Sequence, residues 1–253
     1  MISVISCSID PVKAASIERH YHELLADEPH EFIGVMTPRS LAEGYNAGID
    51  ASCGEIVILS HDDIEFLDQA NWLPRLKAHM AKYDMIGLAG TTKLVSPAWA
   101  QAGPPYTFGQ VGETNDSKLP FRVLLCAVPA PAVVGIQAVD GLFMTARRQV
   151  LDRVRFDAQT FNGFHVYDID FSFSVFLEGF HIAVATDLPV LHYSQGDFNQ
   201  EWRRHAQSFR KKRGDYLSKF RHRPFQHAVV CARTKDELLE IMNGPRRQWC
   251  PYE

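Results

Sequence analysis

The stretch "EIVILSHDDIEF", residues 55–66, contains the pattern on which the fold prediction depends. Its four consecutive apolar residues, 56–59, are typical of a buried strand. Two adjacent carboxylates, Asp62 and Asp63, follow at the point where this strand leaves the core. Because neighbouring anions repel each other, the pair indicates a bound divalent cation, with a helix cap or a solvated loop as the alternative.

Strands and helices alternate through the first third of the chain. Apolar runs predict four strands, at residues 2–7, 31–36, 55–60 and 85–90. Start signals predict three helices: one after Asp10 and Pro11 to about Leu25, one after the Ser40–Glu43 capping box to about Ser52, and one at 71–83. These units predict an α/β fold of Rossmann-like type, with a mostly parallel central sheet and helices on both faces.

The rest of the chain is less regular. Residues 94–121 are rich in glycine, proline, serine and threonine, which is typical of a long functional or mobile stretch. The apolar tract 123–139 contains two prolines and is shorter than a membrane helix, so we interpret it as two sheet segments joined by a proline turn. Further along we expect a strand and helix at 138–151, a helix capped by Asp168, strands at 181–186 and 189–194, a basic helix at about 199–220, and a short helix after Thr234.

Composition narrows the class of protein. The 253 residues are 46% hydrophobic and 22% charged, which is ordinary for a globular protein with a substantial core. A net charge of −4 argues against a dedicated nucleic-acid binder. The five cysteines are scattered and form no CxxC pair, which indicates reduced thiols rather than a disulfide framework or a zinc site. With no visible leader at the N-terminus, we expect a cytoplasmic protein.

Three segments resemble family-2-like glycosyltransferases with the GT-A fold. "SLAEGYNAGIDASCGEIVILSHDDI", residues 40–64, resembles their nucleotide-binding segment, with matches at Asn46, Gly48, Gly54, Glu55 and the Asp62–Asp63 pair. "GFHVYDIDFSFSVFLEGFHIAV", 163–184, is similar to their second signature, in which an acidic pair opens a helix. "VDGLFMTARRQVL", 139–151, resembles the strand that lines the sugar pocket. The resemblance spans residues 2–213.

Two positions depart from the family pattern. The family carries an aspartate two residues before its metal ligand, whereas Ser60 precedes Asp62 and His61 precedes Asp63 at that spacing. The family also has an acidic residue where this chain has Tyr167. One of the two carboxylates is expected to face the metal and the other the ribose or a metal-bound water.

The resemblance implies an inverting glycosyltransferase that moves a sugar from a nucleotide diphosphate sugar to a hydroxyl acceptor. Asp62, Asp63 and His192 would hold Mn²⁺ or Mg²⁺, and this ion would stabilise the leaving diphosphate. A structural role for His192 is as plausible as metal binding. His61 is not expected to bind the ion, because its neighbours would already crowd it. Asp168 is the expected general base, although aspartate is also a favoured helix cap. A UDP-sugar is the favoured donor, with GDP- and dTDP-sugars as alternatives, and the acceptor is a glycan, a lipid-linked group or another hydroxyl.

The resemblance also implies binding residues and three parts of one continuous domain. The nucleotide is expected to contact Ser6, Ser8, Asn46 and Asp62, and the sugars Asp140, Gly141, Asp170 and Trp202. Each has a plain alternative: a turn, an exposed helix position, a β-bulge, a solvated carboxylate or a packing anchor. The parts are a nucleotide-binding half at 1–93, an acceptor and donor-sugar half with the catalytic helix at 94–198, and a helical extension at 199–253.

Basic residues gather at 203–223, in the expected basic helix. They suit a solvated helix face, contact with the diphosphate, or contact with an anionic membrane at its inner face that carries a lipid-linked acceptor.

Three rival functions are open to this sequence. A sugar-phosphate nucleotidyltransferase usually has a glycine-rich loop after the first strand, and "SCSIDPVKAA" has no such glycines. A histidine–aspartate phosphohydrolase would place "HDD" on a helix rather than after a strand. A non-catalytic nucleotide or carbohydrate binder would keep the fold without turnover.

Overall fold

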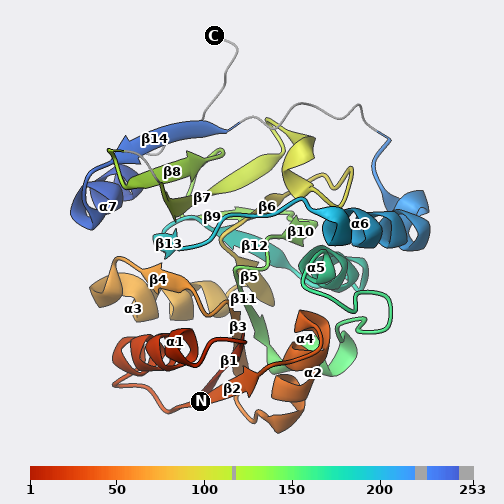
Figure 1. The fold of residues 1–253 in the computed structure, drawn as a ribbon, viewed down its shortest axis with the longest axis horizontal. Coiled ribbons are helices and arrows are strands. Elements are labelled where there is room, and N and C mark those ends of the chain that lie inside the picture. Colours follow the sequence, from red (N-terminus) through yellow and green to blue (C-terminus); the bar gives the residue numbers. More distant parts are fainter. Residues whose placement is uncertain (116–117, 220–226, 245–253) are drawn as a thin grey trace.

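A seven-stranded sheet, called sheet 1, organises the chain (Figure 1). The computed structural model describes residues 1–115, 118–219 and 227–244. Along sheet 1 the strands are β2 (His30–Met36), β1 (Ile2–Ser8), β3 (Ile56–Ser60), β11 (Phe143–Arg147), β5 (Met85–Gly87), β12 (Ile182–Ala185) and β9 (Ala132–Val134). β1 pairs in parallel with β2 and β3, and β12 with β5, while β11 and β9 run antiparallel to their neighbours. The predicted mostly parallel sheet is confirmed.

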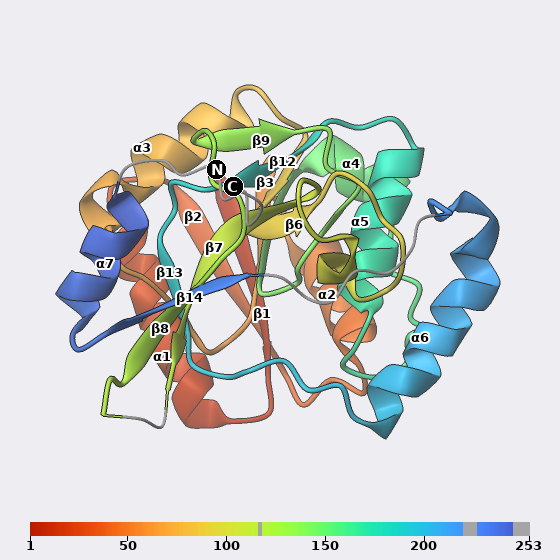
Figure 2. The same cartoon turned by 90° about the horizontal axis from the view of Figure 1, so that it is seen from above.

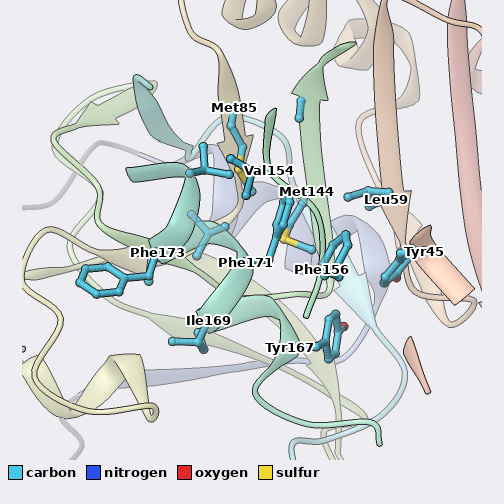
Figure 3. Packing of buried hydrophobic residues seen from close by; sticks show 14 of the residues in the cluster. Tyr45, Leu59, Met85, Met144, Val154, Phe156, Tyr167, Ile169, Phe171 and Phe173 are labelled. Carbon is cyan, nitrogen blue, oxygen red and sulfur yellow. The ribbon is translucent and has the colours of Figure 1, made fainter. Parts of the chain in front are cut away.

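Helices cover both faces of sheet 1, as predicted (Figure 1). One face carries α1 (Pro11–Leu24) and α3 (Gln69–Met80), and the other carries α2 (Leu41–Ala51), α4 (Arg148–Arg153) and α5 (Tyr167–Leu177). Successive strand residues alternate between these faces, so Ile58 joins the core under α1 and α3 and Leu59 the core under α2, α4 and α5. Figure 3 shows Leu59 in the second core, beside Tyr45 of α2 and Phe156.

Most predicted helix starts are confirmed by their caps. Asp10 accepts hydrogen bonds from the backbone of α1, and the Ser40 hydroxyl accepts one from Glu43 N at 3.1 Å. Thr234 caps α7 (Lys235–Asn243) in the same way. The predicted cap at Asp168 is wrong. α5 begins one residue earlier, after a left-handed Val166, so Asp168 lies within its first turn.

A second sheet, sheet 2, lies across the end of the molecule. Its order is β10 (Ala138–Val139), β6 (Ala89–Thr91), β7 (Thr107–Thr114), β13 (Val190–His192) and β4 (Ile64–Phe66). β8 (Phe121–Leu125) pairs with β7, and β14 (Ala228–Ala232) pairs with β8. These two strands and α7 lie together in both views and share a small apolar core (Figures 1 and 2).

Several predicted elements are wrong in the middle of the chain. Residues 85–90 form two strands rather than one, because the chain passes from sheet 1 to sheet 2 at Leu88. Residues 94–121 contain β7, whose glycines hide the apolar alternation, and a short 3₁₀ turn, η1 (Trp99–Ala102). The tract 123–139 contributes to three strands rather than two, and β14 was not predicted.

The basic helix is shorter than predicted. α6 (Gln200–Arg213) ends before Gly214, where a 3₁₀ turn, η2 (Gly214–Tyr216), begins. The predicted basic positions 220–223 and the last cysteine, Cys250, lie outside the described residues. Among the described residues, no helix has the length and apolar character needed to span a bilayer.

The close packing of β1 against the turn before β3 yields a testable prediction. A methyl group at Gly54 would lie 2.6 Å from Ser3 N, a backbone atom of β1 that cannot move aside. Gly54→Ala should therefore lower the free energy of unfolding by about 1–3 kcal/mol. Chemical denaturation measures this loss, and Cys53→Ala at the exposed neighbouring position is the matched control. Equal stabilities of the two variants would contradict this packing.

Candidate functional site

Segments far apart in the sequence meet at one edge of sheet 1, which we call the polar edge. Ser60, the last residue of β3, lies opposite Ser6 of the parallel β1 and opposite Phe143 of the antiparallel β11. Residues 61–63, which follow β3, and residues 140–142, which precede β11, therefore leave the sheet at the same edge. This is the carboxyl end of the parallel strands, where open α/β sheets bind their ligands.

Helix α5 and strand β13 complete the polar edge. Gly141 N donates a hydrogen bond of 2.9 Å to Asp168 Oδ2, which ties the first turn of α5 to the segment before β11. β13 pairs with β4 so that His192 lies opposite Ile64, directly after the carboxylate pair. Three residues predicted from separate motifs, Asp63, Asp168 and His192, are thus brought to one place.

Three possible metal ligands, called the His–Asp–His cluster, come from His61, Asp63 and His192. One ligand atom from each lies within 4.8 Å of the other two. His192 Nε2 is 3.2 Å from Asp63 Oδ1 and 3.5 Å from His61 Nδ1. Two imidazole nitrogens and a carboxylate suit a divalent transition ion, so these residues fit the predicted metal. His61, which was expected to stay off the ion, lies in this cluster with Asp63 and His192.

Asp62 does not belong to the cluster. Its Oδ2 accepts a hydrogen bond of 2.5 Å from the Ser8 hydroxyl at the end of β1. Burial raises the pKa of Asp62, and the hydrogen bond from Ser8 opposes this rise. The chain bends at Asp62 and Asp63, and the contact with Ser8 holds the Asp62 carboxylate outside the cluster. The two adjacent carboxylates therefore have different surroundings, one toward β1 and one toward the histidines.

In the metal-free cluster, electrostatics favour an ionised Asp63 and a neutral His61, while the hydrogen bond and charge of Asp63 outweigh burial and raise the pKa of His192. Burial alone would raise the pKa of Asp63, but the hydrogen bond and charge of His192 hold that pKa well below its usual range. Burial, together with the charge of His192, lowers the pKa of His61 to about 4. His61 Nε2 lies 2.9 Å from the buried Tyr167 hydroxyl, so its Nδ1 is the nitrogen that faces the cluster.

The position and the raised pKa of Asp168 suit a candidate base. Burial and the nearby Asp140 carboxylate raise the pKa of Asp168 to about 7. Gly141 lies in a turn, which was one alternative to a sugar contact, and a methyl group there would lie 2.7 Å from Asp168 Cβ, so the glycine also permits the close approach of α5. Asp140 Oδ2 accepts a hydrogen bond of 3.1 Å from Trp99 Nε1, which brings η1 to the polar edge.

Two predicted nucleotide contacts are used by the protein itself. The Asn46 side chain donates to Phe156 O at 2.9 Å and accepts from Phe156 N at 3.1 Å, which closes the segment before α5 onto α2. The amide that was predicted to contact a nucleotide therefore contacts the Phe156 backbone in this structure, and the nucleotide contact stays a prediction. Ser6 lies inside β1 rather than after it, and its buried hydroxyl has no hydrogen-bond partner among the described residues. Ser8 ends β1 and contacts Asp62.

The predicted sugar contact at Asp170 is also wrong. Its side chain is 3% exposed, and its two oxygens lie 2.8 Å from Arg213 Nε and 2.8 Å from Lys212 Nζ. The alternative of a solvated carboxylate fails for the same reason. Lys212 also contacts Asp157 at 2.6 Å. These ion pairs hold α6 against α5, and the two helices lie side by side in Figures 1 and 2.

Helix α6 divides its residues between packing and solvent. Trp202 is half-buried against the core, and its ring meets that of Phe198 edge to face at 4.9 Å between centroids. This contact supports the alternative that Trp202 anchors the helix. Five basic residues of α6 are exposed: Arg203, Arg204, Arg210, Lys211 and Lys212, the last of which has its ammonium in the ion pairs with Asp157 and Asp170.

Sequence reasoning missed Lys13 and Trp99 at the polar edge, and it gave no binding role to His61 or Tyr167, which it named only as departures from the family pattern. Lys13 Nζ is 3.5 Å from Asp63 Oδ2, because the helix that follows β1 begins beside the end of that strand. His61 lies two residues before Asp63, and this closeness in sequence is the signal that could have placed it in the cluster. No comparable pattern announces Trp99 or Tyr167, whose contacts depend on tertiary packing.

A model of the glycosyltransferase-like family matches residues 3–216. The chain belongs to this glycosyltransferase-like family. None of the curated proteins compared with the chain matches it. Among solved structures, the chain is similar to the mannosyltransferase PcManGT from Pyrobaculum calidifontis, which was determined in complex with GDP-Man and Mn²⁺. That similarity has 11% identity and a TM-score of 0.52, and it covers 95% of this chain and 68% of that one.

The chain is also similar to S. aureus TarS 1–349, with 12% identity and a TM-score of 0.47. This match covers 83% of the present chain and 65% of that chain. The family match, together with the likeness to the mannosyltransferase, confirms the predicted GT-A fold class.

The ion pairs of Asp170 yield a second prediction. Asp170→Asn leaves Lys212 and Arg213 without their buried partner, so it should lower the free energy of unfolding by about 3–5 kcal/mol. Asp157→Asn, which removes a more exposed partner of Lys212, should cost clearly less. Equal losses measured by denaturant titration would show that Asp170 does not hold α6.

The raised pKa of Asp168 yields a third prediction. Between pH 3.8, the ordinary pKa, and about pH 7, native Asp168 keeps a proton that the unfolded chain loses. Its contribution to stability therefore falls as the pH rises through this window. In metal-free protein, the unfolding temperature of Asp168→Asn minus that of the parent should increase from pH 4 to pH 7. This difference should level off above pH 8. A constant difference across this range would contradict the raised pKa.

Proposed function

We propose that the protein is an inverting, metal-assisted transferase that moves a hexosyl group from a nucleotide diphosphate sugar to a hydroxyl acceptor. The observation that carries this proposal is the meeting of the His–Asp–His cluster and Asp168 at the polar edge of a GT-A fold. It supports the proposal because the reaction needs positive charge near the leaving diphosphate and a base near the attacking hydroxyl.

His61, Asp63 and His192 would hold a divalent cation, Mn²⁺ or Mg²⁺. When bound there, the cation supplies Lewis-acid stabilisation of the charge that develops on the leaving diphosphate. Lys13, with its ammonium 3.5 Å from Asp63 Oδ2 and half-exposed, adds a second positive charge on the same side. Asp62 and Ser8, at the end of β1, would contact the ribose or a water of the nucleotide site.

Asp168 would accept the proton of the acceptor hydroxyl as that oxygen attacks the anomeric carbon. A base with a pKa of about 7 is partly ionised at neutral pH and still basic enough to take the proton. A single base acting in line with the leaving group gives inversion. Asp140 and Gly141, beside Asp168, would line the donor sugar, and Trp99 fixes the Asp140 carboxylate.

The donor and acceptor are proposed by chemical class. A UDP-sugar remains the favoured donor, with GDP- and dTDP-sugars as alternatives; PcManGT, the similar mannosyltransferase, was determined with GDP-Man. The acceptor is a glycan, a lipid-linked group or another hydroxyl compound. For a cytoplasmic protein with a lipid-linked acceptor, the exposed Arg203, Arg204, Arg210 and Lys211 of α6 would contact the anionic inner face of a membrane.

Asp168→Asn tests the base. The variant should bind the nucleotide sugar with nearly unchanged affinity, while transfer falls about 10²–10⁴-fold, the usual contribution of a general base. In the parent protein, kcat/KM should rise with pH through about 7, because the ionised form of Asp168 is the active one. Calorimetry with UDP-, GDP- and dTDP-sugars in Mn²⁺ identifies the donor, and product analysis then measures transfer.

Asp152→Asn, an exposed carboxylate on α4, is the control and should transfer at the parent rate. Full transfer by the Asp168 variant would reject the base assignment. Tight nucleotide-sugar binding without any turnover by the parent would favour the non-catalytic binder instead.

A further inference from the structure

We propose that Tyr167 and His61, the two departures from the family pattern, act together as a device for metal selection. Tyr167 positions the His61 ring so that its Nδ1 becomes a third ligand, and the resulting two-imidazole, one-carboxylate site prefers Mn²⁺ to Mg²⁺. The inference rests on the proposed function only in assuming that a divalent cation binds at the polar edge. It concerns which cation is chosen and which residues choose it.

The spacing of the three ligand atoms suits one shared ion. Two nitrogens bound to one ion at about 2.1 Å lie about 3.0–3.4 Å apart for angles between 90° and 109°. His192 Nε2 lies 3.5 Å from His61 Nδ1 and 3.2 Å from Asp63 Oδ1. His192 Nε2 is therefore close to the spacing that a shared ion requires from each of the other two ligand atoms, and all three atoms lie within 4.8 Å of one another.

Tyr167 controls which nitrogen of His61 is free to bind. For Nδ1 to present its lone pair, the ring proton must reside on Nε2 and needs an acceptor there. The Tyr167 hydroxyl oxygen lies 2.9 Å from Nε2 and is the partner that can accept this hydrogen bond. An outer partner of this kind typically contributes 10–100-fold to the metal affinity of a histidine site.

Packing fixes Tyr167 in turn. Its ring lies in the core beside Tyr45 and Phe156, as Figure 3 shows, and it is 4% exposed. A methyl group at Gly141 would lie 2.6 Å from the Tyr167 hydroxyl, so the glycine leaves room for that hydroxyl. Tyr167 is therefore a rigid support for His61 and, through the adjacent Asp168, links the metal site to the catalytic helix.

The donor set explains the preference. Mg²⁺ demands oxygen ligands in octahedral geometry and gives up its water reluctantly, whereas imidazole suits transition ions. Two further carboxylates lie nearby in sequence, and both are outside the cluster: Asp62 is held by Ser8, and Glu65 by Tyr193 and Lys235. Among the described residues, the cluster thus offers an ion one carboxylate and two nitrogens.

The test measures ion binding directly, without a sugar nucleotide. Free Mn²⁺ is followed by electron paramagnetic resonance during titration of the full chain, and Mg²⁺ is then added as competitor. The variants are His61→Asp, which replaces a nitrogen by oxygens, and Tyr167→Phe, which removes only the hydroxyl. His30→Gln is the control, because His22 and His30 form an exposed pair with ring nitrogens 2.7 Å apart that could take up Mn²⁺ adventitiously.

The parent and His30→Gln should bind one Mn²⁺ at least about tenfold more tightly than Mg²⁺. His61→Asp should lose most of that preference, because it should bind Mn²⁺ more weakly and Mg²⁺ more tightly than the parent. Tyr167→Phe should bind Mn²⁺ about 10–100-fold more weakly than the parent, while its unfolding temperature without metal stays the same. In a protein that already carries His61→Ala, Tyr167→Phe should cause little further loss of Mn²⁺ affinity. A purely structural role for Tyr167 would not produce this non-additivity.

Two results would overturn the inference: equal affinities of the parent for the two ions, or Mn²⁺ binding that ignores both His61 and Tyr167 substitutions. The proposed function is judged separately, by transfer with and without a chelator. Transfer that needs a cation but follows neither substitution would leave the glycosyltransferase proposal standing and reject the selection device.

Discussion

The pairing of β3 with β1 on one side and β11 on the other is the constraint on which the site depends. The parallel partner places Ser8 beside the carboxylate pair, and the antiparallel partner returns residues 140–142 to the same edge. A shift of one residue in either register would reverse every side chain of a strand between the two cores. The buried residues of β3, which alternate between those cores, fix the register and so position the polar edge.

The polar edge concentrates negative charge that the fold itself does not need. Asp62, Asp63, Asp140 and Asp168 gather there, and burial raises the pKa of two of them, Asp62 and Asp168. Only Asp63 is strongly stabilised in its ionised form, by His192. Such an arrangement costs stability in the metal-free protein and is typical of functional sites, where perturbed pKa values cluster. Asp170, on the same helix α5 as Asp168, shows the opposite pattern, because both of its carboxylate oxygens form ion pairs with basic side chains.

The first turn of helix α5 makes two kinds of contact. Tyr167 contacts His61 and Asp168 contacts the segment before β11, while Asp170 faces α6 and is bound by Lys212 and Arg213. The close approach at Gly141 holds the first turn against the segment before β11. The position of the candidate base is thus set by packing and ion pairs that do not themselves take part in the reaction.

The sequence by itself determined the α/β class, the mostly parallel sheet and the starts of α1, α2 and α7, because apolar periodicity and caps are local signals. It also identified Asp63, Asp168 and His192 as residues of interest through motif order. Only the tertiary structure decided their partners. The separation of Asp62 from Asp63, the inclusion of His61, and the use of Asn46 and Asp170 for packing all depend on side-chain or backbone groups more than 20 residues away. Local pattern shows where a polar side chain leaves a strand or helix, but its neighbour across the sheet determines what that side chain can bind.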